Sequence, residues 1–239
     1  MKVSVVIPMY NESSIIDEAI KTFSGYLKEN FEDWELIFVT DGSTDGCDKS
    51  VVAASETEPR IKLAGYDVNR GKGCAVRTGM LEAEGDIILF TDCDNAYGEE
   101  AVGRMIRMFD ETDADIIIGS RNLTKDGYED YTFIRRLASK TYIKILQIAA
   151  GFKLSDSQSG IKAFRREAAR KVFSNCEVDR FAFDLEAILI AQKAGFKIEE
   201  MPVKIINHRE SKVRVLRDAV KMLSDLRKMK KRIKKTELK

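Results

Sequence analysis

Short apolar runs alternate with amphipathic stretches along the first half of the chain. Five segments are predicted strands, and each ends in polar or glycine-rich residues: 3–7, 35–40, 61–67, 86–91 and 115–121. Of these, 3–7 and 86–91 are expected to be buried. The stretches between them space their apolar residues as helices do, and they cover 13–27, 47–56, 74–84 and 98–110. Ser13 is the expected cap of the first helix, and Thr44 or Asp45 that of the second. This alternation predicts an α/β fold with a mostly parallel, Rossmann-like sheet flanked by helices.

The second half of the chain has a less regular pattern. Residues 131–151 combine a wide apolar surface with basic residues, which is typical of a core helix or of an interfacial helix on a bilayer or lipid. Further helices are expected from about residue 166, around 181–186, and from about Val213 into the basic C-terminal residues. The last expected strand covers 197–206, bends near Pro202 and has a face shared by Ile198, Met201, Val203 and Ile205. No repeat or linker interrupts the pattern, so we predict one domain at 1–225 and a basic tail at 226–239.

Charge is distributed unevenly along the chain. The net charge is +1, but residues 227–239 hold eight Lys or Arg and one acid, which leaves 32 basic and 38 acidic residues elsewhere, a net of −6. A basic tail on an acidic body favours an anionic surface such as a membrane as partner and argues against nucleic acid. A solvated helix end would have the same composition, so charge alone leaves both interpretations open.

Several classes of site are excluded by composition. His208 is the sole histidine, which rules out catalytic triads and multi-histidine zinc sites. The four cysteines are widely spaced, which indicates free thiols in a reducing compartment. The N-terminal apolar run is too short for a signal peptide. No stretch approaches about 20 uncharged apolar residues, so we expect no transmembrane helix.

Two carboxylates follow the fourth expected strand. Asp92 and Asp94 are two residues apart, and on an extended backbone this spacing points both side chains to the same side. Carboxylate oxygens at such a place are suited to a hard divalent cation, Mg²⁺ or Mn²⁺, shared with phosphate oxygens. The alternative is a solvated strand end. Placement favours the metal site, because ligands of parallel sheets bind beyond the carboxyl ends of the strands.

Two other strand ends carry candidate binding loops. Asp41 opens the sequence DGSTDG and could accept hydrogen bonds from a nucleobase or ribose, although turn and cap chemistry would explain it equally. The sequence NRGKG at 69–73 places Arg70 and Lys72 beside backbone amides near a helix start, which suits an anion. It lacks the spacing of a Walker loop, so an ordinary glycine-rich turn is the competing interpretation.

In order along the chain, these segments resemble the signatures of family 2 glycosyltransferases with the GT-A fold. The segments are VVIPMYNE at 5–12, DGSTDG at 41–46, NRGKG at 69–73 and DCD at 92–94. The segments GSR at 119–121, DSQSGIK at 156–162, RFAFDLE at 180–186 and SK at 211–212 extend the resemblance to dolichyl- or polyprenyl-phosphate sugar synthases. They are more similar to the dolichyl-phosphate beta-glucosyltransferase branch than to the mannosyl branch, and the resemblance covers about residues 3–225.

The resemblance implies an inverting, metal-dependent transfer of a hexose to a polyprenyl or dolichyl monophosphate. Glucose is favoured and mannose is possible, which makes UDP-glucose the preferred donor over GDP-mannose. The residues it implies around the nucleotide are Pro8, Tyr10, Glu12, Asp41, Arg70, Lys72 and Asp92. Asp92 and Asp94 would hold Mg²⁺ or Mn²⁺, and the acceptor phosphate would meet Arg121, Arg135, Ser211 and Lys212. Asp94, Asp184, Arg121 and Arg135 would be catalytic, with Asp184 orienting the acceptor or serving as base toward a hydroxyl.

Two departures from the family pattern qualify this expectation. Many members have two acids before Gly-Ser at the second strand, and here the first is Thr40. Many relatives also carry transmembrane helices, so membrane contact here would come from 131–151, from the basic tail or from a membrane-protein partner. The resemblance then implies a cytoplasmic protein, peripheral at the inner face of the membrane. Two alternatives stay open: a family member with a soluble sugar hydroxyl as acceptor, and a non-catalytic module that binds sugar nucleotides.

Overall fold

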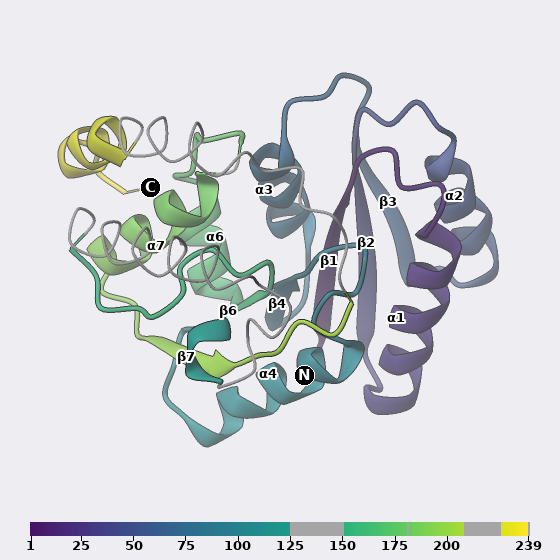
Figure 1. The fold of residues 1–239 in the computed structure, drawn as a ribbon, viewed down its shortest axis with the longest axis horizontal. Coiled ribbons are helices and arrows are strands. Elements are labelled where there is room, and N and C mark those ends of the chain that lie inside the picture. Colours follow the sequence, from purple (N-terminus) through teal and green to yellow (C-terminus); the bar gives the residue numbers. More distant parts are fainter. Residues whose placement is uncertain (125–150, 181, 208–225, 239) are drawn as a thin grey trace, which may run out of the picture.

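The computed structural model describes residues 1–124, 151–180, 182–207 and 226–238 (Figure 1). The strands are β1 (Val3–Met9), β2 (Trp34–Asp41), β3 (Ile61–Tyr66), β4 (Ile87–Phe90), β5 (Ile116–Ser120), β6 (Lys162–Arg165) and β7 (Ile198–Pro202). The helices are α1 (Ile16–Asn30), α2 (Cys47–Thr57), α3 (Lys72–Glu82), α4 (Glu99–Glu111), α6 (Arg166–Phe173) and α7 (Phe183–Lys193), with a short 3-10 turn η1 (Arg121–Leu123). Residues 226–235 are also helical.

The described strands form one sheet in the order β3-β2-β1-β4-β6-β5-β7. The pairs β1–β2, β1–β4, β2–β3 and β5–β7 are parallel, whereas β6 runs antiparallel to both of its neighbours. The strands β1, β2, β4 and β5 are buried along almost their whole length, as expected when helices cover both sides of a sheet, whereas the edge strands β3 and β7 have exposed residues. The predicted α/β, mostly parallel sheet is therefore confirmed.

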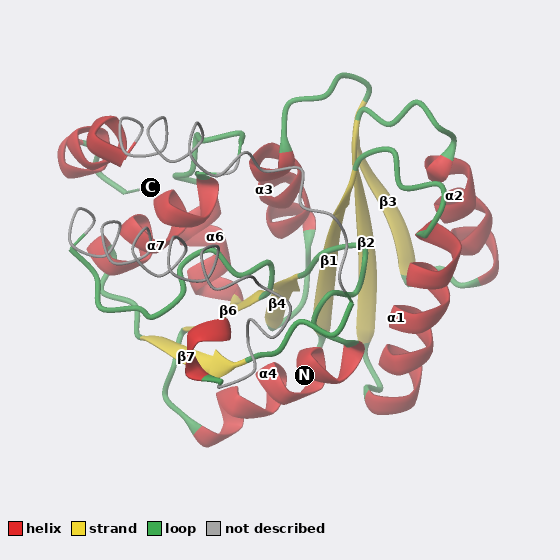
Figure 2. Cartoon of the chain, viewed as in Figure 1, coloured by secondary structure: helices red, strands yellow, loops and turns green. Residues whose placement is uncertain are grey.

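Side chains alternate between two apolar cores, one on each face of the sheet. Val6 and Ile37 face a core formed with α3, α6, α7 and the helix 226–235. Their sequence neighbours Val5 and Leu36 face a second core formed with α1, α2 and α4. Figure 2 shows the helices on both sides of the yellow sheet. This sandwich leaves the loops at the strand ends as the place where polar side chains collect.

Three local expectations were wrong. Ser13 does not cap α1: Ile15 precedes the helix, and the Ser13 backbone N–H donates to the Asp45 carboxylate at 2.7 Å. Neither Thr44 nor Asp45 is the cap residue of α2, because Gly46 occupies that position. The strand β6 was not predicted. The shared face predicted for the last strand fails for Ile198, which packs on the α3 side, while Met201, Val203 and Ile205 pack on the other. The reason is parity, because strand residues alternate faces and 198 is even.

The described part of the basic tail is docked on the domain. Leu226, Met229 and Ile233 are buried in the core that α6 and α7 form, and they repeat at helical spacing. Lys193 of α7 donates to the carbonyl oxygens of Ile233 and Thr236 at 2.5 Å each. The division of the chain at residue 225 stays a prediction. The helices expected at 131–151 and near Val213 lie outside the described residues.

Candidate active site

The carboxyl ends of β1, β2 and β4 meet at one edge of the sheet. Met9 pairs with Thr40 in the parallel register, and the Thr91 N–H donates to the Val6 carbonyl oxygen at 3.0 Å. Tyr10, Asp41 and Asp92, which follow or end these strands, are thereby brought to the same edge. Pro8 lies inside β1 opposite Val39. The structure thus assembles loops that are far apart in sequence, as parallel topology requires.

Asp41 organises the loop that follows β3. Its buried carboxylate accepts hydrogen bonds from the Tyr66 hydroxyl at 2.8 Å, the Asn69 side-chain amide at 2.9 Å and the backbone N–H groups of Arg70 and Gly71 at 2.8 and 3.0 Å. Two backbone donors and two side-chain donors saturate most of the lone pairs of one carboxylate. Asp41 therefore fixes the 69–71 loop, and its contact with a nucleotide stays a prediction.

Lys72 begins α3 and reaches across to the acids after β4. Its ammonium group forms an ion pair with Asp92 Oδ1. Burial alone would lower the pKa of Lys72, but the carboxylates of Asp92, Asp184 and Asp94 raise it above its ordinary value. Both side chains of the pair keep more than a quarter of their surface exposed. We name Lys72, Asp92 and Asp94 the β4 edge, a charged group that solvent and ligands can reach.

The backbone at Gly160 closes against the β4 edge. A Cβ atom at Gly160 would lie 1.9 Å from Asp92 Oδ2, so only glycine allows this approach. The Gly160 N–H donates to the Tyr97 hydroxyl at 2.9 Å, which fixes the approach from the other side. Residues around Gly160 therefore set the position of the Asp92 carboxylate.

A buried ion pair lies behind Asp92. Lys162 of β6 is 1% exposed, and its ammonium group donates to Asp184 Oδ1 and to the Ser159 carbonyl oxygen at 2.6 Å each. It also lies 5.4 Å from the centre of the Phe90 ring, within cation–π range. Burial raises the pKa of Asp184 above its ordinary value, although Lys162 and Lys72 oppose the shift. The predicted residue Asp184 is thus held in a low-dielectric setting by a lysine.

Arg121 is bound by a second buried acid. Its Nε and Nη2 atoms donate to the two carboxylate oxygens of Asp156 at 2.6 and 3.0 Å. Burial would raise the pKa of Asp156, but the Arg121 guanidinium outweighs burial and lowers it. We use the name β6 cluster for the buried charged residues Asp156, Lys162 and Asp184 together with the fully buried Glu186 of α7. Each of them is paired with an opposite charge.

The loops after β1 and β2 are joined to each other. The Asn11 N–H donates to the Ser43 hydroxyl at 3.2 Å, and the Asn11 side-chain oxygen accepts the Thr44 N–H at 2.8 Å. Asn11 has a φ of 53°, a left-handed conformation that asparagine tolerates better than most residues. Asp45 accepts the Ser13 N–H, and its pKa is lowered to about 2 by that bond and by Cys47. Tyr10 and Glu12 are carried on this paired loop.

The donor atoms at the β4 edge suit a divalent cation. Asp92 and Asp94 supply hard carboxylate oxygens, which divalent cations prefer as ligands. The Lys72 ammonium group is already paired with the Asp92 carboxylate. Among the described residues no group of three or more histidine, cysteine, aspartate or glutamate side chains is arranged around a common point. Asp92 and Asp94 are therefore the carboxylates that this part of the described chain offers to a cation.

The structure brings the loops that carry Tyr10, Asp41, Lys72 and Asp92 to one edge of the sheet, and the functions of the candidate residues stay predictions. Arg135, Ser211 and Lys212 lie outside the described residues, and Arg70 is exposed near the Tyr66 ring. The sequence analysis did not identify three residues that contact candidate residues: Lys162 contacts Asp184, Gly160 contacts Asp92, and Asp156 contacts Arg121. Lys162 could have been noticed as a lone cation within an otherwise apolar run, IKAF.

Comparison with known proteins finds one set of proteins with a similar fold and another with a similar sequence. A crystal structure of glucosyl-3-phosphoglycerate synthase from Mycobacterium tuberculosis, with Mn²⁺, UDP-glucose and phosphoglyceric acid, superposes with a TM-score of 0.71. It is 19% identical, and the match covers 99% of this chain and 81% of that one. A dolichyl-phosphate beta-glucosyltransferase of Trichomonas vaginalis is 33% identical over 231 residues, which cover 92% of this chain and 68% of that protein. One from Dictyostelium discoideum is 31% identical over 93% of this chain and 72% of its own length.

The mixed sheet, with its polar loops at the carboxyl ends of parallel strands, is the GT-A fold of glycosyltransferases. The sequence model described as Glycosyl transferase family 2 matches residues 4–173. The chain belongs to this family and is a glycosyltransferase. The predicted family, fold class and enzyme class are therefore confirmed.

Proposed function

We propose that the protein transfers glucose, with inversion, from UDP-glucose to a polyprenyl or dolichyl monophosphate. The relatives at about 30% identity that carry this activity in their names support the choice of sugar and acceptor. The observation that carries the proposal is the β4 edge, where Asp92, Asp94 and Lys72 converge beside three strand-end loops. Two acids and one lysine at such an edge suit a diphosphate with its cation.

The donor would bind with its diphosphate at the β4 edge. Asp92 and Asp94 would hold Mg²⁺ or Mn²⁺, which neutralises charge that develops on the leaving diphosphate. Lys72 would contact the phosphate oxygens, and the α3 N-terminus would add its backbone N–H groups. The nucleoside would lie among Pro8 of β1, Asp41 at the end of β2, and the loops that carry Tyr10, Glu12 and Arg70. Asn11 and Asp45 join the loops after β1 and β2 to each other.

The acceptor would approach from the side of β5 and β6. A phosphate monoester is already anionic near neutral pH, so its oxygen needs orientation and charge compensation more than a strong base. Arg121 follows β5 and is oriented by Asp156, which suits it to a phosphate. Arg135, Ser211 and Lys212 are proposed for the same phosphate from sequence alone. Asp184 would orient the acceptor near the reacting oxygen.

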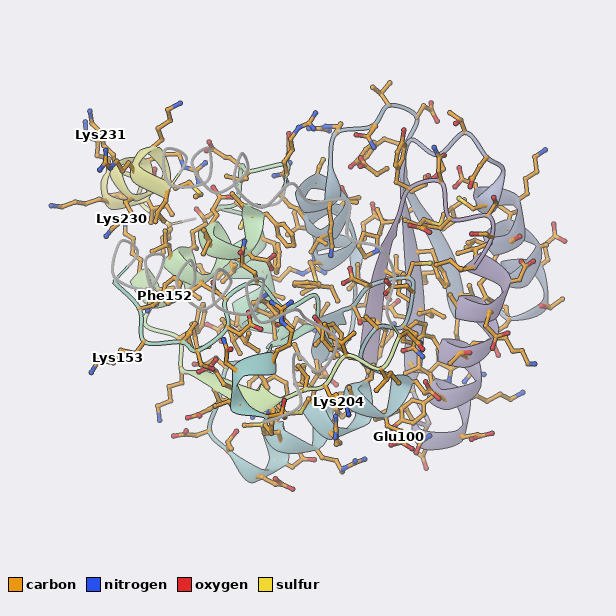
Figure 3. All side chains as sticks on the ribbon, viewed as in Figure 1. Glu100, Phe152, Lys153, Lys204, Lys230 and Lys231 are labelled. Atoms are coloured by element: carbon orange, nitrogen blue, oxygen red, sulfur yellow. The ribbon has the colours of Figure 1, made fainter. Side chains whose placement is uncertain are left out.

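The outward face of the helix 226–235 supports contact with an anionic membrane at the cytoplasmic side. Its six exposed basic residues are Arg227, Lys228, Lys230, Lys231, Lys234 and Lys235. In Figure 3, Lys230 and Lys231 project away from the rest of the molecule. The apolar face of the helix is already buried, so this contact would be electrostatic, at about 1 kcal/mol per cation. Among the described residues no helix is long and apolar enough to cross a bilayer.

A two-phase transfer assay tests the proposal. The protein is incubated with Mn²⁺, polyprenyl phosphate and either labelled UDP-glucose or labelled GDP-mannose, and label is then counted in the organic phase. We expect label from UDP-glucose with the wild type and background counts with Asp92→Ala. If label enters only soluble sugars, the acceptor is a sugar hydroxyl and not a lipid phosphate. If label comes from GDP-mannose alone, the donor is GDP-mannose and not UDP-glucose.

Liposome co-sedimentation tests the membrane contact separately. Replacing Lys228, Lys231, Lys234 and Lys235 by glutamine leaves the buried face of the helix unchanged, so the domain stays intact. We expect binding to vesicles with about 30% anionic lipid to fall strongly in this variant and in 0.5 M salt, because exposed charges are screened. Unchanged binding by the variant would assign the contact to another surface.

A further inference from the structure

The C-terminal helix contacts the interior of the domain through one side chain. Arg232 forms ion pairs with Glu177 and with the fully buried Glu186 of α7. Burial raises the pKa of Glu186, and the nearby Arg232 opposes that shift. A buried carboxylate is stable only when charge and hydrogen bonds compensate it, so Arg232 is the cation on which Glu186 depends.

Glu186 in turn holds the loop that follows α6. Its Oε2 atom accepts the backbone N–H groups of Glu177 and Val178 at 2.9 and 2.8 Å. Both bonds are charge-assisted and shielded from water, which makes them stronger than ordinary backbone bonds. The carboxylate that Arg232 neutralises therefore anchors residues 177–178, while Arg77 of α3 holds the residues on either side through the Cys176 carbonyl oxygen and the Asp179 carboxylate.

The same loop supports the segment that carries Lys72. A Cβ atom at Gly71 would lie 2.6 Å from the Asp179 carbonyl oxygen, and one at Gly73 would lie 2.5 Å from the Val178 carbonyl oxygen. The Cys74 N–H donates to the Asp179 carbonyl oxygen at 3.1 Å. The two residues that flank Lys72 thus rest directly on the backbone that Glu186 holds.

We propose that Arg232 is a positioning residue for the donor site: through Glu186 and residues 177–179 it sets the place of Lys72 at the start of α3. The chain of contacts is continuous, from the tail to a buried acid, to a loop backbone, to the glycines around Lys72. The proposal rests on the proposed function only for the assignment of Lys72 to a diphosphate. It makes the C-terminal helix part of the active-site scaffold in addition to its outward basic face.

The test uses the full chain, with UDP and Mn²⁺ as the probe in isothermal titration. In Arg232→Met we expect UDP affinity to fall about tenfold, the order seen when a supporting contact behind a ligand is lost. Deuterium uptake at the amides of residues 177 and 178 should rise in the same variant, because their acceptor has lost its counter-charge. Adding Glu186→Gln should restore affinity to within about threefold of wild type, since the amide oxygen still accepts both N–H groups and needs no cation.

Lys193→Met is the matched control. Lys193 donates to the carbonyl oxygens of Ile233 and Thr236 in the tail. Neither of these bonds involves Glu186. A variant that merely loosens the tail should lower Tm and leave both UDP affinity and uptake at 177–178 unchanged. Equal UDP affinity and equal uptake in folded Arg232→Met and wild type would overturn the proposal.

Two further outcomes also decide between the alternatives: a variant that does not fold, and a wild type that binds no UDP. If Arg232→Met does not fold, Arg232→Lys carries the test: it keeps the charge but loses the forked geometry, so a smaller loss of UDP affinity is expected, and wild-type affinity would overturn the proposal. If the wild type itself binds no UDP, the donor assignment fails. The exchange measurement then decides alone whether Arg232 orders residues 177–178.

Discussion

Charges at the β4 edge are partly open to solvent, whereas those of the β6 cluster are buried. Asp92 and Lys72 keep 30% and 27% of their side-chain surface exposed, but Lys162 keeps 1% and Glu186 none. Exposed charges cost little to maintain and can exchange partners, while buried charges must stay paired. This difference fits the proposal that the β4 edge binds a ligand, and it suggests that the β6 cluster holds the site in shape.

The sharpest test of that comparison is the loss of Asp92. Asp92→Ala should lower transfer activity roughly 10²- to 10³-fold, because charge stabilisation at the leaving diphosphate is lost. Unfolding free energy should change by at most about 1 kcal/mol, since the side chain is part-exposed. Steady-state kinetics and urea unfolding measure the two effects.

Asp86→Ala is the control for that prediction. Asp86 precedes β4, at the opposite end of the strand, where it pairs with Arg166 and with the Lys2 N–H. It should leave activity unchanged. Equal losses of activity in both variants would show that the strand, and not its carboxyl end, matters.

In contrast to Asp92→Ala, Lys162→Met should mainly lower the stability of the fold. It leaves Asp184 buried without its cation, so unfolding free energy should fall by about 3–5 kcal/mol. Adding Asp184→Asn should recover part of the loss, because the uncompensated charge is gone. Urea unfolding of the single and double variants measures the coupling.

Lys197→Met is the control, because Lys197 forms an exposed ion pair with Asp113. Its unfolding free energy should stay within about 0.5 kcal/mol of wild type. If Lys162→Met is as stable as wild type, the β6 cluster is not a scaffold.

Asp156→Asn tests the cluster through pH. Arg121 holds the pKa of Asp156 below its ordinary value of 3.8, so its stabilisation is complete above 3.8 and is lost as pH falls through the lower folded-state value. The wild type should be more stable than the variant by about 2 kcal/mol at pH 7 and 5. Urea unfolding below pH 3.8 should show that advantage shrinking. An advantage that stays constant between pH 4 and 2.5 would contradict the assigned ion pair.

Gly160→Ala probes the junction between the two groups. The new Cβ would force Asp92 Oδ2 to move, so activity should fall about tenfold through a misplaced ligand, with little change in Tm. Gly25→Ala lies in α1 with nothing within 4 Å of the new Cβ, and it should add about 0.5–1 kcal/mol of stability without affecting activity. Kinetics at saturating Mn²⁺ compare the two, and an unchanged Gly160→Ala would remove Gly160 from the site.

The two regions also differ in how well sequence predicts them. The central strands β1, β4 and β5 are mainly apolar runs that end in polar loops, so the alternation of strands and helices, and the position of Asp92 after a strand, follow from local pattern. β6 was missed because it has only four residues, two of them basic, and it joins β4 and β5 from far along the chain. Its antiparallel direction has no local signal.

Buried pairs were missed because their partners are distant in sequence. Lys162 and Asp184 are 22 positions apart, and Arg232 and Glu186 are 46 apart. Nothing in the spacing shows which acid neutralises which base. Ser13 illustrates the same limit on a smaller scale: it has the identity of a helix cap, but Asp45 binds its N–H from another loop.

Transfer to a lipid phosphate can be tested with a matched pair of acceptors. The wild type is given labelled UDP-glucose and Mn²⁺ with either polyprenyl phosphate or the unphosphorylated polyprenol of equal chain length. We predict label in the organic phase with the phosphate and background counts with the alcohol. Equal labelling of both acceptors, or labelling of neither, would contradict the account.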